Sequence, residues 1–241
     1  MTLLCLDCGN TRLKWGLHSN GLWLERGALP LTGIGLLPET IFSLPRPARA
    51  IACNVAGMQA SDAIAAVAET LAVPLTWATA RAEQRGVKNS YDVPSRLGAD
   101  RWAALIGASS VHRGACLVVN AGTATTIDVL DGECVFRGGL ILPGIDLMRA
   151  ALAGNTAQLP LAEGKFDALP RNTADAIASG ALQATAGAIE RMFQRLAGQA
   201  GAICLLSGGA AENLAPLLDI PLLCIDNLVL EGLAQLADKQ E

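Results

Sequence analysis

The sequence has few charged residues, few aromatic residues and no long apolar run. Charged residues make up 17% of the 241-residue chain and aromatic residues 4%, whereas apolar residues make up 51%. The chain can therefore bury a large core, which Ala, Leu, Val and Ile have to fill. Because no stretch of about 18 apolar residues occurs, we expect no membrane span, and the N-terminus lacks the basic segment of a signal peptide.

Positive charge is scarce as well. The formal net charge is -4, and the chain has no basic cluster. This composition argues against a nucleic-acid or anionic-membrane partner, because both attract concentrated positive charge. A small anionic ligand would have to be bound by local backbone amides and a few cations.

The chain contains seven cysteines, an odd number, and most of them lie within apolar runs. This usage is typical of reduced thiols in the core of a cytoplasmic protein. Cys5 and Cys8 have C-x-x-C spacing, but residues three apart on a strand point to opposite faces, which disfavours redox or zinc chemistry. The two histidines, His18 and His112, have no metal-binding spacing, and we assign neither a catalytic role.

Alternating apolar residues predict an antiparallel sheet at the N-terminus. Its strands cover residues 3–6, 12–17 and 22–28, and Asn20-Gly21 offers a hairpin turn. The following residues predict a strand from 49, a helix over 61–72 capped by Ser61, a strand over 73–79, a long loop over 81–97 and a helix from Ala99.

The second half repeats the opening pattern. A strand ends at Asn120, a glycine turn at Gly122 follows, and Asp131-Gly132 offers another hairpin turn before a third strand. We interpret the repetition as two copies of one α/β domain, although strand–turn–strand units are common enough to recur by chance. The next residues predict a strand-to-helix passage over 138–152 and a helix over 172–197 capped by Asn172 or Thr173. Residues 201–218 predict a strand, a Ser207-Gly208-Gly209 turn and a helix. A last helix is predicted over 225–237, capped by Asp226 or Asn227.

Both glycine turns, "DCGNT" at 7–11 and "NAGTATT" at 120–126, are suited to phosphate binding, because glycine lets a ligand approach the backbone amides. The hydroxyls of Thr11, Thr123 and Thr125 add donors, and Lys14 could reach a terminal phosphate. Asp7 lies where a magnesium–phosphate complex needs an oxygen ligand. Each turn taken alone is more often just a tight hairpin.

Phosphoryl transfer also needs a group that orients and deprotonates an acceptor hydroxyl, and Asp100 is the best candidate. A purely structural interpretation is equally simple, since an Asp in the first helical turn interacts well with the helix dipole. Arg101 and Tyr91, the chain's single tyrosine, lie nearby in the sequence. These residues together suggest a pocket for a small polar acid.

The motifs "DCGNTRLKWG", "YDVPSRLGADRWAALIGA", "NAGTATTID", "GGLILPG", "NTADAIASGA" and "LLSGGAAENL" occur in this order and span most of the chain. In this order they resemble the type III pantothenate kinases, also called the Bvg accessory factor family. The resemblance implies an α/β fold of the actin-like ASKHA superfamily, with two ribonuclease-H-like domains and a nucleotide cleft between them. We place these domains at 1–111, with the first phosphate loop and the pantothenate loop, and at 112–241, with the second phosphate loop, an adenosine turn and a dimer helix.

The resemblance also implies the activity. A protein of this kind phosphorylates the terminal hydroxyl of pantothenate with ATP and Mg²⁺, the first step of coenzyme A synthesis, as a cytoplasmic homodimer. By position it implies the following roles: catalytic base, Asp100; ATP binding, Asp7, Cys8, Gly9, Asn10, Thr11, Arg12, Leu13, Lys14, Gly122 and Thr123; pantothenate binding, Tyr91, Gly98, Ala99, Asp100, Arg101 and Thr173; Mg²⁺ binding, Asp7.

Two other interpretations stay open at this point. The same fold could be a nucleotide-binding regulator without transfer activity, as the accessory-factor name suggests, or a kinase for a different small hydroxy acid. Asp100, Tyr91 and Arg101 favour catalysis, because a pure regulator needs no acceptor pocket.

One position departs from the family and generates a prediction. Asn120 stands where the family usually has an aspartate that is linked to a monovalent cation, potassium or ammonium. Because asparagine keeps an oxygen ligand but lacks the charge, we expect potassium binding, and dependence on potassium, to be weakened or lost. The rate measured across a potassium titration, with sodium as the control ion, should stay flat. Steep activation by potassium over sodium would contradict this expectation.

Overall fold

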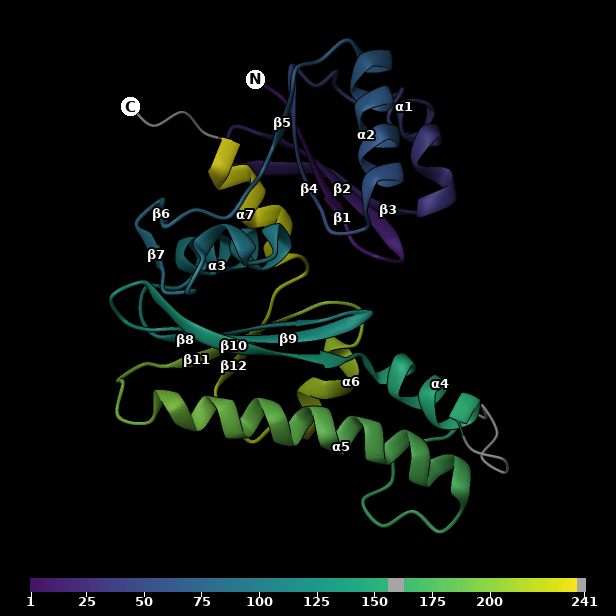
Figure 1. Ribbon diagram of the computed structural model, residues 1–241, viewed down its shortest axis with the longest axis vertical. Coiled ribbons are helices and arrows are strands. Elements are labelled where there is room, and N and C mark those ends of the chain that lie inside the picture. Colours follow the sequence, from purple (N-terminus) through teal and green to yellow (C-terminus); the bar gives the residue numbers. More distant parts are fainter. Residues whose placement is uncertain (156–162, 238–241) are drawn as a thin grey trace. The chain divides into compact units, whose positions relative to one another are not determined.

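A computed structural model describes residues 1–155 and 163–237. The described chain divides into two compact units. Unit 1 comprises residues 1–113 and 227–237, and unit 2 comprises 114–155 and 163–226. Each unit contains a mixed β-sheet with helices packed on it (Figure 1).

Unit 1 is built on a five-stranded sheet in the order β3-β2-β1-β4-β5. The first three strands form an antiparallel meander, and β4 and β5 continue the sheet in parallel. Its elements are β1 (Leu3–Cys8), β2 (Arg12–Ser19), β3 (Leu22–Pro30), α1 (Leu37–Thr40), β4 (Arg49–Asn54), α2 (Met58–Leu71), β5 (Leu75–Trp77), β6 (Glu83–Gln84), β7 (Val87–Asn89), α3 (Ala99–Val111) and α7 (Leu228–Ala237).

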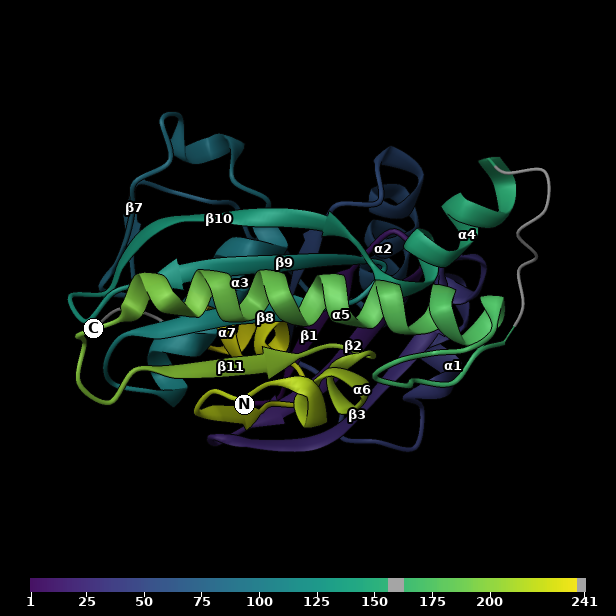
Figure 2. The same cartoon turned by 90° about the horizontal axis from the view of Figure 1, so that it is seen from below.

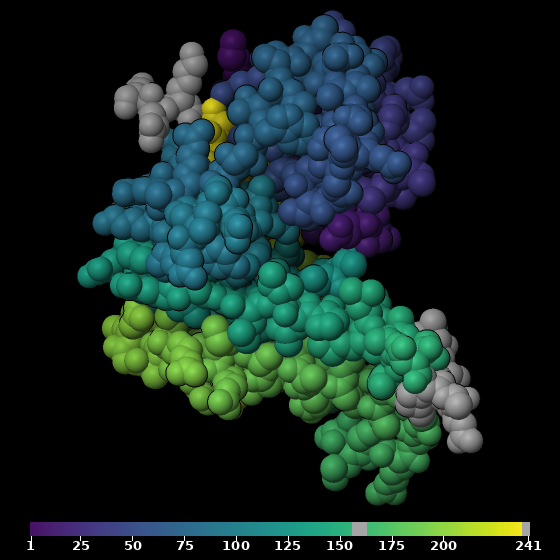
Figure 3. All heavy atoms as spheres, viewed as in Figure 1, coloured from purple at the N-terminus to yellow at the C-terminus, as the bar shows by residue number. Residues whose placement is uncertain are grey.

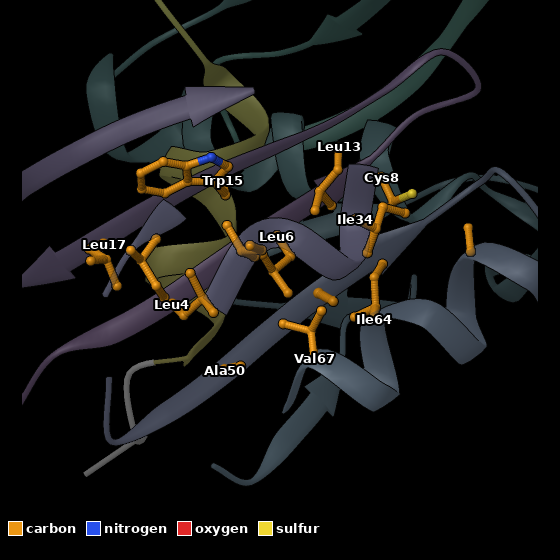
Figure 4. Close-up of a cluster of buried hydrophobic side chains, with 14 residues drawn as sticks. Leu4, Leu6, Cys8, Leu13, Trp15, Leu17, Ile34, Ala50, Ile64 and Val67 are labelled. Atoms are coloured by element: carbon orange, nitrogen blue, oxygen red, sulfur yellow. The ribbon is translucent and has the colours of Figure 1, made fainter. Parts of the chain in front are cut away.

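Both faces of β1 are buried. Leu4, Leu6 and Cys8 point to one face, where they pack against Ile64 and Val67 of α2 (Figure 4). The intervening side chains, among them Asp7, therefore point to the opposite face. A carboxylate thus lies at the carboxyl end of an otherwise apolar buried strand.

Several predicted features of unit 1 are confirmed. The predicted N-terminal hairpin turn is present, because Asn20 and Gly21 both have positive φ, 51° and 81°. This is the conformation that a type I′ turn requires. The last helix is capped by Asn227, whose side-chain oxygen accepts a hydrogen bond from the amide of Leu230 at 3.0 Å.

Two predictions in unit 1 are wrong. Ser61 does not cap its helix, because α2 begins three residues earlier at Met58, after Gly57. The predicted long loop over 81–97 contains the β6–β7 hairpin and a short 3₁₀ turn at Pro94–Arg96. Its strands are two and three residues long, too short for alternation to reveal, and the turn residues Arg85 and Gly86 both have positive φ.

Unit 2 contains five strands in the order β10-β9-β8-β11-β12, which is the order of unit 1 position by position. Helix α5 lies along β8 and β9 on one face of this sheet, as Figures 1 and 2 both show. The elements are β8 (Cys116–Ala121), β9 (Ala124–Leu130), β10 (Val135–Pro143), α4 (Ile145–Asn155), α5 (Thr173–Phe193), β11 (Ile203–Ser207), α6 (Ala211–Leu214) and β12 (Leu222–Cys224).

The repeated strand order supports the duplication inferred from the two glycine turns. The expected division at 111/112 stays a prediction, and the compact units differ from it chiefly in the last helix, since α7 packs in unit 1. The hairpin between β9 and β10 is present, but the residue with positive φ is Cys134, not Gly132. The Asp131 carboxylate instead accepts hydrogen bonds from the amides of Glu133 and Val135, and these bonds stabilise a longer turn.

No helix among the described residues is long and apolar enough to cross a membrane.

Helices α3 and α7 approach each other so closely that only glycine fits at their crossing. A Cβ on Gly232 would lie 1.7 Å from the carbonyl oxygen of Ala103, and a Cβ on Gly107 would lie 2.3 Å from that of Leu228. The predicted catalytic residue Asp100 lies in the first turn of α3. The close α3–α7 crossing therefore helps to fix the position of this turn in unit 1.

We expect Gly232→Ala to lower the free energy of unfolding by about 3 kcal/mol, because the added methyl group overpacks the α3–α7 crossing. The matched control is Gly187→Ala in α5, where nothing lies within 4 Å of the place that a Cβ would occupy. That change should raise stability by about 0.5–1 kcal/mol, the usual benefit of removing a helical glycine. Denaturant unfolding measures both, and equal effects would refute the packing argument.

Candidate functional site

Asp7 lies in a row of three side chains that crosses neighbouring strands of unit 1. It pairs in register with Lys14 on β2 and with Cys53 on β4. The Lys14 Nζ lies 4.0 Å from Asp7 Oδ2, and the Cys53 Sγ donates a hydrogen bond of 3.5 Å to Asp7 Oδ1. Asp7 is only 6% exposed, whereas the Lys14 side chain is one-third exposed. The row therefore connects a buried thiol to a cation that reaches solvent.

Burial raises the pKa of Asp7 above its ordinary value, and the nearby charge of Asp100 raises it further. The ammonium of Lys14 and the hydrogen bond from Cys53 oppose this increase without cancelling it. Asp7 and Asp100 thus lie within electrostatic range of each other in unit 1. An additional cation at Asp7 would relieve the cost of its charge.

The turn after β1 is shaped by its own backbone. The Gly9 amide donates to the carbonyl of Arg12 at 3.1 Å, and in the second glycine turn, which is tighter by one residue, the Gly122 amide donates to the carbonyl of Ala124 at 3.1 Å. Neither glycine has positive φ, and a Cβ on either would meet only ordinary van der Waals contact. The fold therefore has room for a Cβ at both positions, and the close approach of a ligand to these backbones stays a prediction.

The side chains of the first turn divide into two groups. Cys8 and Leu13 are fully buried, so only their backbone can contact a ligand. Asn10, Thr11 and Arg12 are exposed. The predicted ATP-binding segment therefore presents polar side chains at its centre and, through Lys14, at its end.

The second turn is held by two further glycines of unit 2. A Cβ on Gly144 would lie 2.2 Å from the carbonyl oxygen of Gly122, and a Cβ on Gly208 would lie 2.4 Å from that of Ala121. The predicted adenosine turn, which contains Gly208, thus packs directly on the predicted phosphate turn. Thr123 is exposed, but Thr125 is 1% exposed and faces the core, so its hydroxyl is not presented at the turn surface.

Asn120 is half-buried near the end of β8. It pairs in register with Thr126 on β9 and with Ser207 on β11. Its amide is thus flanked by hydroxyl-bearing residues on both neighbouring strands, which are oxygen donors of the kind that a cation accepts.

The predicted acceptor pocket lies at the start of α3. Asp100 is in the first turn, and its Oδ1 accepts a hydrogen bond from the Arg101 amide at 2.8 Å. A Cβ on Gly98 would lie 2.6 Å from the same oxygen, so a larger residue there would displace the Asp100 carboxylate. Arg101 is 6% exposed, and its guanidinium lies 5.9 Å from the ring centroid of Tyr91. The structure therefore brings together Tyr91, Gly98, Ala99, Asp100 and Arg101.

Asn89, which the sequence analysis missed, holds the segment that carries Tyr91. Its side-chain oxygen accepts the Tyr91 amide at 3.0 Å, and its side-chain nitrogen donates to the carbonyls of Arg81 and Pro94 at 3.1 and 3.2 Å. An Asn two residues before a loop aromatic is an Asx-turn signal that could have identified it.

Thr173 belongs to unit 2, where it begins α5. The cap is reciprocal: Asn172 accepts the Asp175 amide at 2.9 Å and donates to the Asp175 carboxylate at 2.6 Å. Hydrogen bonds from the Lys165 amide and from Asn172 hold the pKa of Asp175 below its ordinary value. Thr173 lines a cavity of about 980 Å³ between α4 and α5, and Figure 3 shows this end of α5 in green.

A magnesium ion fits the donor set around Asp7. Among the described residues no cluster of three or more His, Cys, Asp or Glu side chains could hold a metal. Mg²⁺ needs no such cluster, because it commonly takes one or two carboxylates and completes its shell with water and phosphate oxygens. One buried carboxylate beside a phosphate turn is therefore a sufficient protein contribution.

Comparison with known proteins gives a consistent result. A family model described as type III pantothenate kinase matches residues 3–195. A protein named type III pantothenate kinase from Aromatoleum aromaticum is 55% identical, over 98% of this chain and 97% of its own. One of the same name from Dechloromonas aromatica is 48% identical, over 98% and 99%.

Solved structures resemble the chain over nearly its full length. A Baf family protein from Campylobacter jejuni has a TM-score of 0.63 at 20% identity and covers 97% of this chain and 96% of its own. The ethanolamine utilization protein EutJ from Carboxydothermus hydrogenoformans has a TM-score of 0.60 at 13% identity, over 98% and 90%. Likenesses at such identities show the fold alone, and they confirm the expected two-domain α/β class.

We expect Asn89→Ala to loosen the segment 81–97, because it removes three hydrogen bonds that tie this segment together. Limited trypsin digestion should then cleave faster after Arg85 and Lys88, without a change in global unfolding. Asn89→Asp, which keeps the acceptor for the Tyr91 amide but loses both donors, should be intermediate. Digestion rates equal to wild type in both variants would show that Asn89 does not hold the segment.

Proposed function

The chain belongs to the type III pantothenate kinase family, and on that premise we propose that it transfers the γ-phosphoryl group of ATP to the terminal hydroxyl of pantothenate. The product is 4′-phosphopantothenate, in the first step of coenzyme A biosynthesis. The observation that carries the proposal is that unit 1 contains a second carboxylate, Asp100, whose charge raises the pKa of Asp7 and which adjoins the Arg101–Tyr91 contact.

Asp7 and the glycine turns serve the phosphates. The turn from Cys8 to Lys14 contributes backbone amides and the Lys14 ammonium, and Gly122 and Thr123 contribute the second set of amides. A magnesium ion bound by Asp7 would neutralise charge that develops on the phosphate oxygens. The position of Lys14 supports phosphate binding beside Asp7. Its side chain is one-third exposed and can reach a ligand, and its ammonium lies 4.0 Å from Asp7.

Asp100 serves the acceptor. In the proposed step the hydroxyl oxygen forms a bond to the γ-phosphorus, the bond to the bridging oxygen of ADP breaks, and the hydroxyl proton passes to Asp100. Arg101 holds the pantothenate carboxylate or an adjacent polar group, and Tyr91, Gly98 and Ala99 line the pocket. The hydrogen bond from the Arg101 amide to Oδ1 supports this assignment, because it fixes the carboxylate orientation.

We further propose a cytoplasmic homodimer in which α5 contributes Thr173 to pantothenate binding. The cavity beside Thr173 supports an interface here, because apolar side chains near it are exposed: Leu147 is 47% exposed, Leu152 41% and Leu169 82%. Sedimentation equilibrium should give twice the chain mass. A monomeric mass would rule out the dimer and its contribution of Thr173, whereas the kinase reaction itself is tested by ADP release.

The direct test of function is ADP release with pantothenate and with a panel of other hydroxylated acids. We expect ADP release that depends on pantothenate. The absence of acceptor-dependent ADP release would favour a nucleotide-binding regulator, and preference for another acid would favour a kinase of different specificity.

We expect Asp100→Asn to lower kcat by about 10²–10⁴-fold, because asparagine cannot accept the proton. The amide oxygen can still accept the Arg101 hydrogen bond, so ATP binding should persist. ADP-release kinetics and calorimetric ATP titration measure the two effects. The control Asp62→Asn removes an exposed carboxylate of α2 in the same unit and should leave both values unchanged.

If turnover survives in Asp100→Asn, the carboxylate serves only the start of α3 and the assigned base is wrong.

A further inference from the structure

We propose that Cys53 is a positioning residue for Asp7, whose thiol holds one carboxylate oxygen so that the other is directed to the cation side of the site. The inference rests on the proposed function and concerns a residue outside both glycine turns. It depends on the contact between Cys53 Sγ and Asp7 Oδ1 and on the register that creates this contact.

The register makes the contact a property of the sheet. Asp7 on β1 and Cys53 on β4 are paired in a parallel ladder, and Lys14 on β2 pairs with Asp7 from the other side. The two neighbours touch different oxygens: the thiol is 3.5 Å from Oδ1, and the ammonium is 4.0 Å from Oδ2. One oxygen is thus held by a neutral donor and the other faces a cation.

The chemistry of the thiol suits this role. Cys53 is fully buried, and its thiol donates the hydrogen bond to Asp7 Oδ1. A thiol is a neutral donor. A neutral donor orients the carboxylate and leaves its negative charge available to a magnesium ion. A second cationic side chain would also orient the carboxylate, but it would compensate part of that charge.

Packing alone would predict different behaviour. Cys204 is also fully buried, but it lies in the apolar core of unit 2 and packs with Leu206 and Leu214. A serine hydroxyl in such a core loses its hydrogen bonds to water, so serine should be worse than alanine there. At Cys53 the carboxylate is available as an acceptor, so serine should be better than alanine.

The experiment compares Cys53→Ser, Cys53→Ala and Asp7→Asn with wild type. The first readout is the dissociation constant of Mn²⁺·ADP, followed by the electron paramagnetic resonance signal of unbound Mn²⁺. The second is kcat/KM for MgATP with pantothenate, and the third is thermal unfolding of the ligand-free protein. Cys204→Ser and Cys204→Ala are the matched controls for loss of a buried thiol.

We expect Cys53→Ala to weaken Mn²⁺·ADP binding about tenfold and to lower kcat/KM in parallel, the lower end of the effect of removing a ligand-orienting partner. Cys53→Ser should return both values to within about threefold of wild type, because a hydroxyl replaces the lost donor. The Cys204 variants should change unfolding temperature but not Mn²⁺·ADP affinity.

Wild-type affinity and kcat/KM in both Cys53 variants, with loss of both in Asp7→Asn, would overturn the inference and leave the proposed kinase intact. The inference would also be overturned if Cys53→Ser and Cys53→Ala lost the same Mn²⁺·ADP affinity and kcat/KM and these losses simply paralleled a lower unfolding temperature. Wild-type values in Asp7→Asn would remove the role of Asp7 and with it that of Cys53. Pantothenate-dependent ADP release by the wild type tests the kinase itself independently.

Discussion

The proposed site in unit 1 depends on one buried carboxylate, Asp7, which lies at the end of a strand between the thiol of Cys53 and the ammonium of Lys14. Burial and the charge of Asp100 raise the pKa of Asp7, and Lys14 and Cys53 lower it without cancelling the increase. A raised pKa means that the ligand-free fold binds a proton more tightly than the unfolded chain, so stability falls as the pH rises through that pKa. The ionised form of the side chain therefore costs stability, and a metal–phosphate complex bound there would offset this cost.

The duplicated strand order explains why such a site arises at a strand end. In each unit a buried strand (β1 or β8) terminates in a glycine turn, and its two neighbours fix the residues beside that turn. In unit 1 the pairing with β4 brings Cys53 to Asp7, and the α3–α7 crossing sets the start of α3. The position of Asp100 thus depends on Gly107 and Gly232, which lie more than a hundred residues apart in the sequence. A local sequence pattern cannot indicate such a contact.

Local chemistry and hairpin pairing could be predicted from the sequence, and pairing between strands far apart in the chain could not. The Asn20-Gly21 turn and the Asn172 cap follow from propensities that act within a few residues. The Arg85-Gly86 hairpin was missed because its strands are too short to alternate, and Cys53 because its partner lies 46 residues away. The resemblance placed Tyr91 and Arg101 in one pocket, but the bonds of Asn89 that hold this segment became visible only in the fold.

The most direct test is a crystal structure of the protein with Mg²⁺, a non-hydrolysable ATP analogue and pantothenate. We predict that Asp7 binds the metal directly or through one water molecule, and that an Asp100 oxygen lies within hydrogen-bond distance of the terminal hydroxyl. A complex in which the metal is bound elsewhere, or in which Asp100 points away from that hydroxyl, would contradict the account.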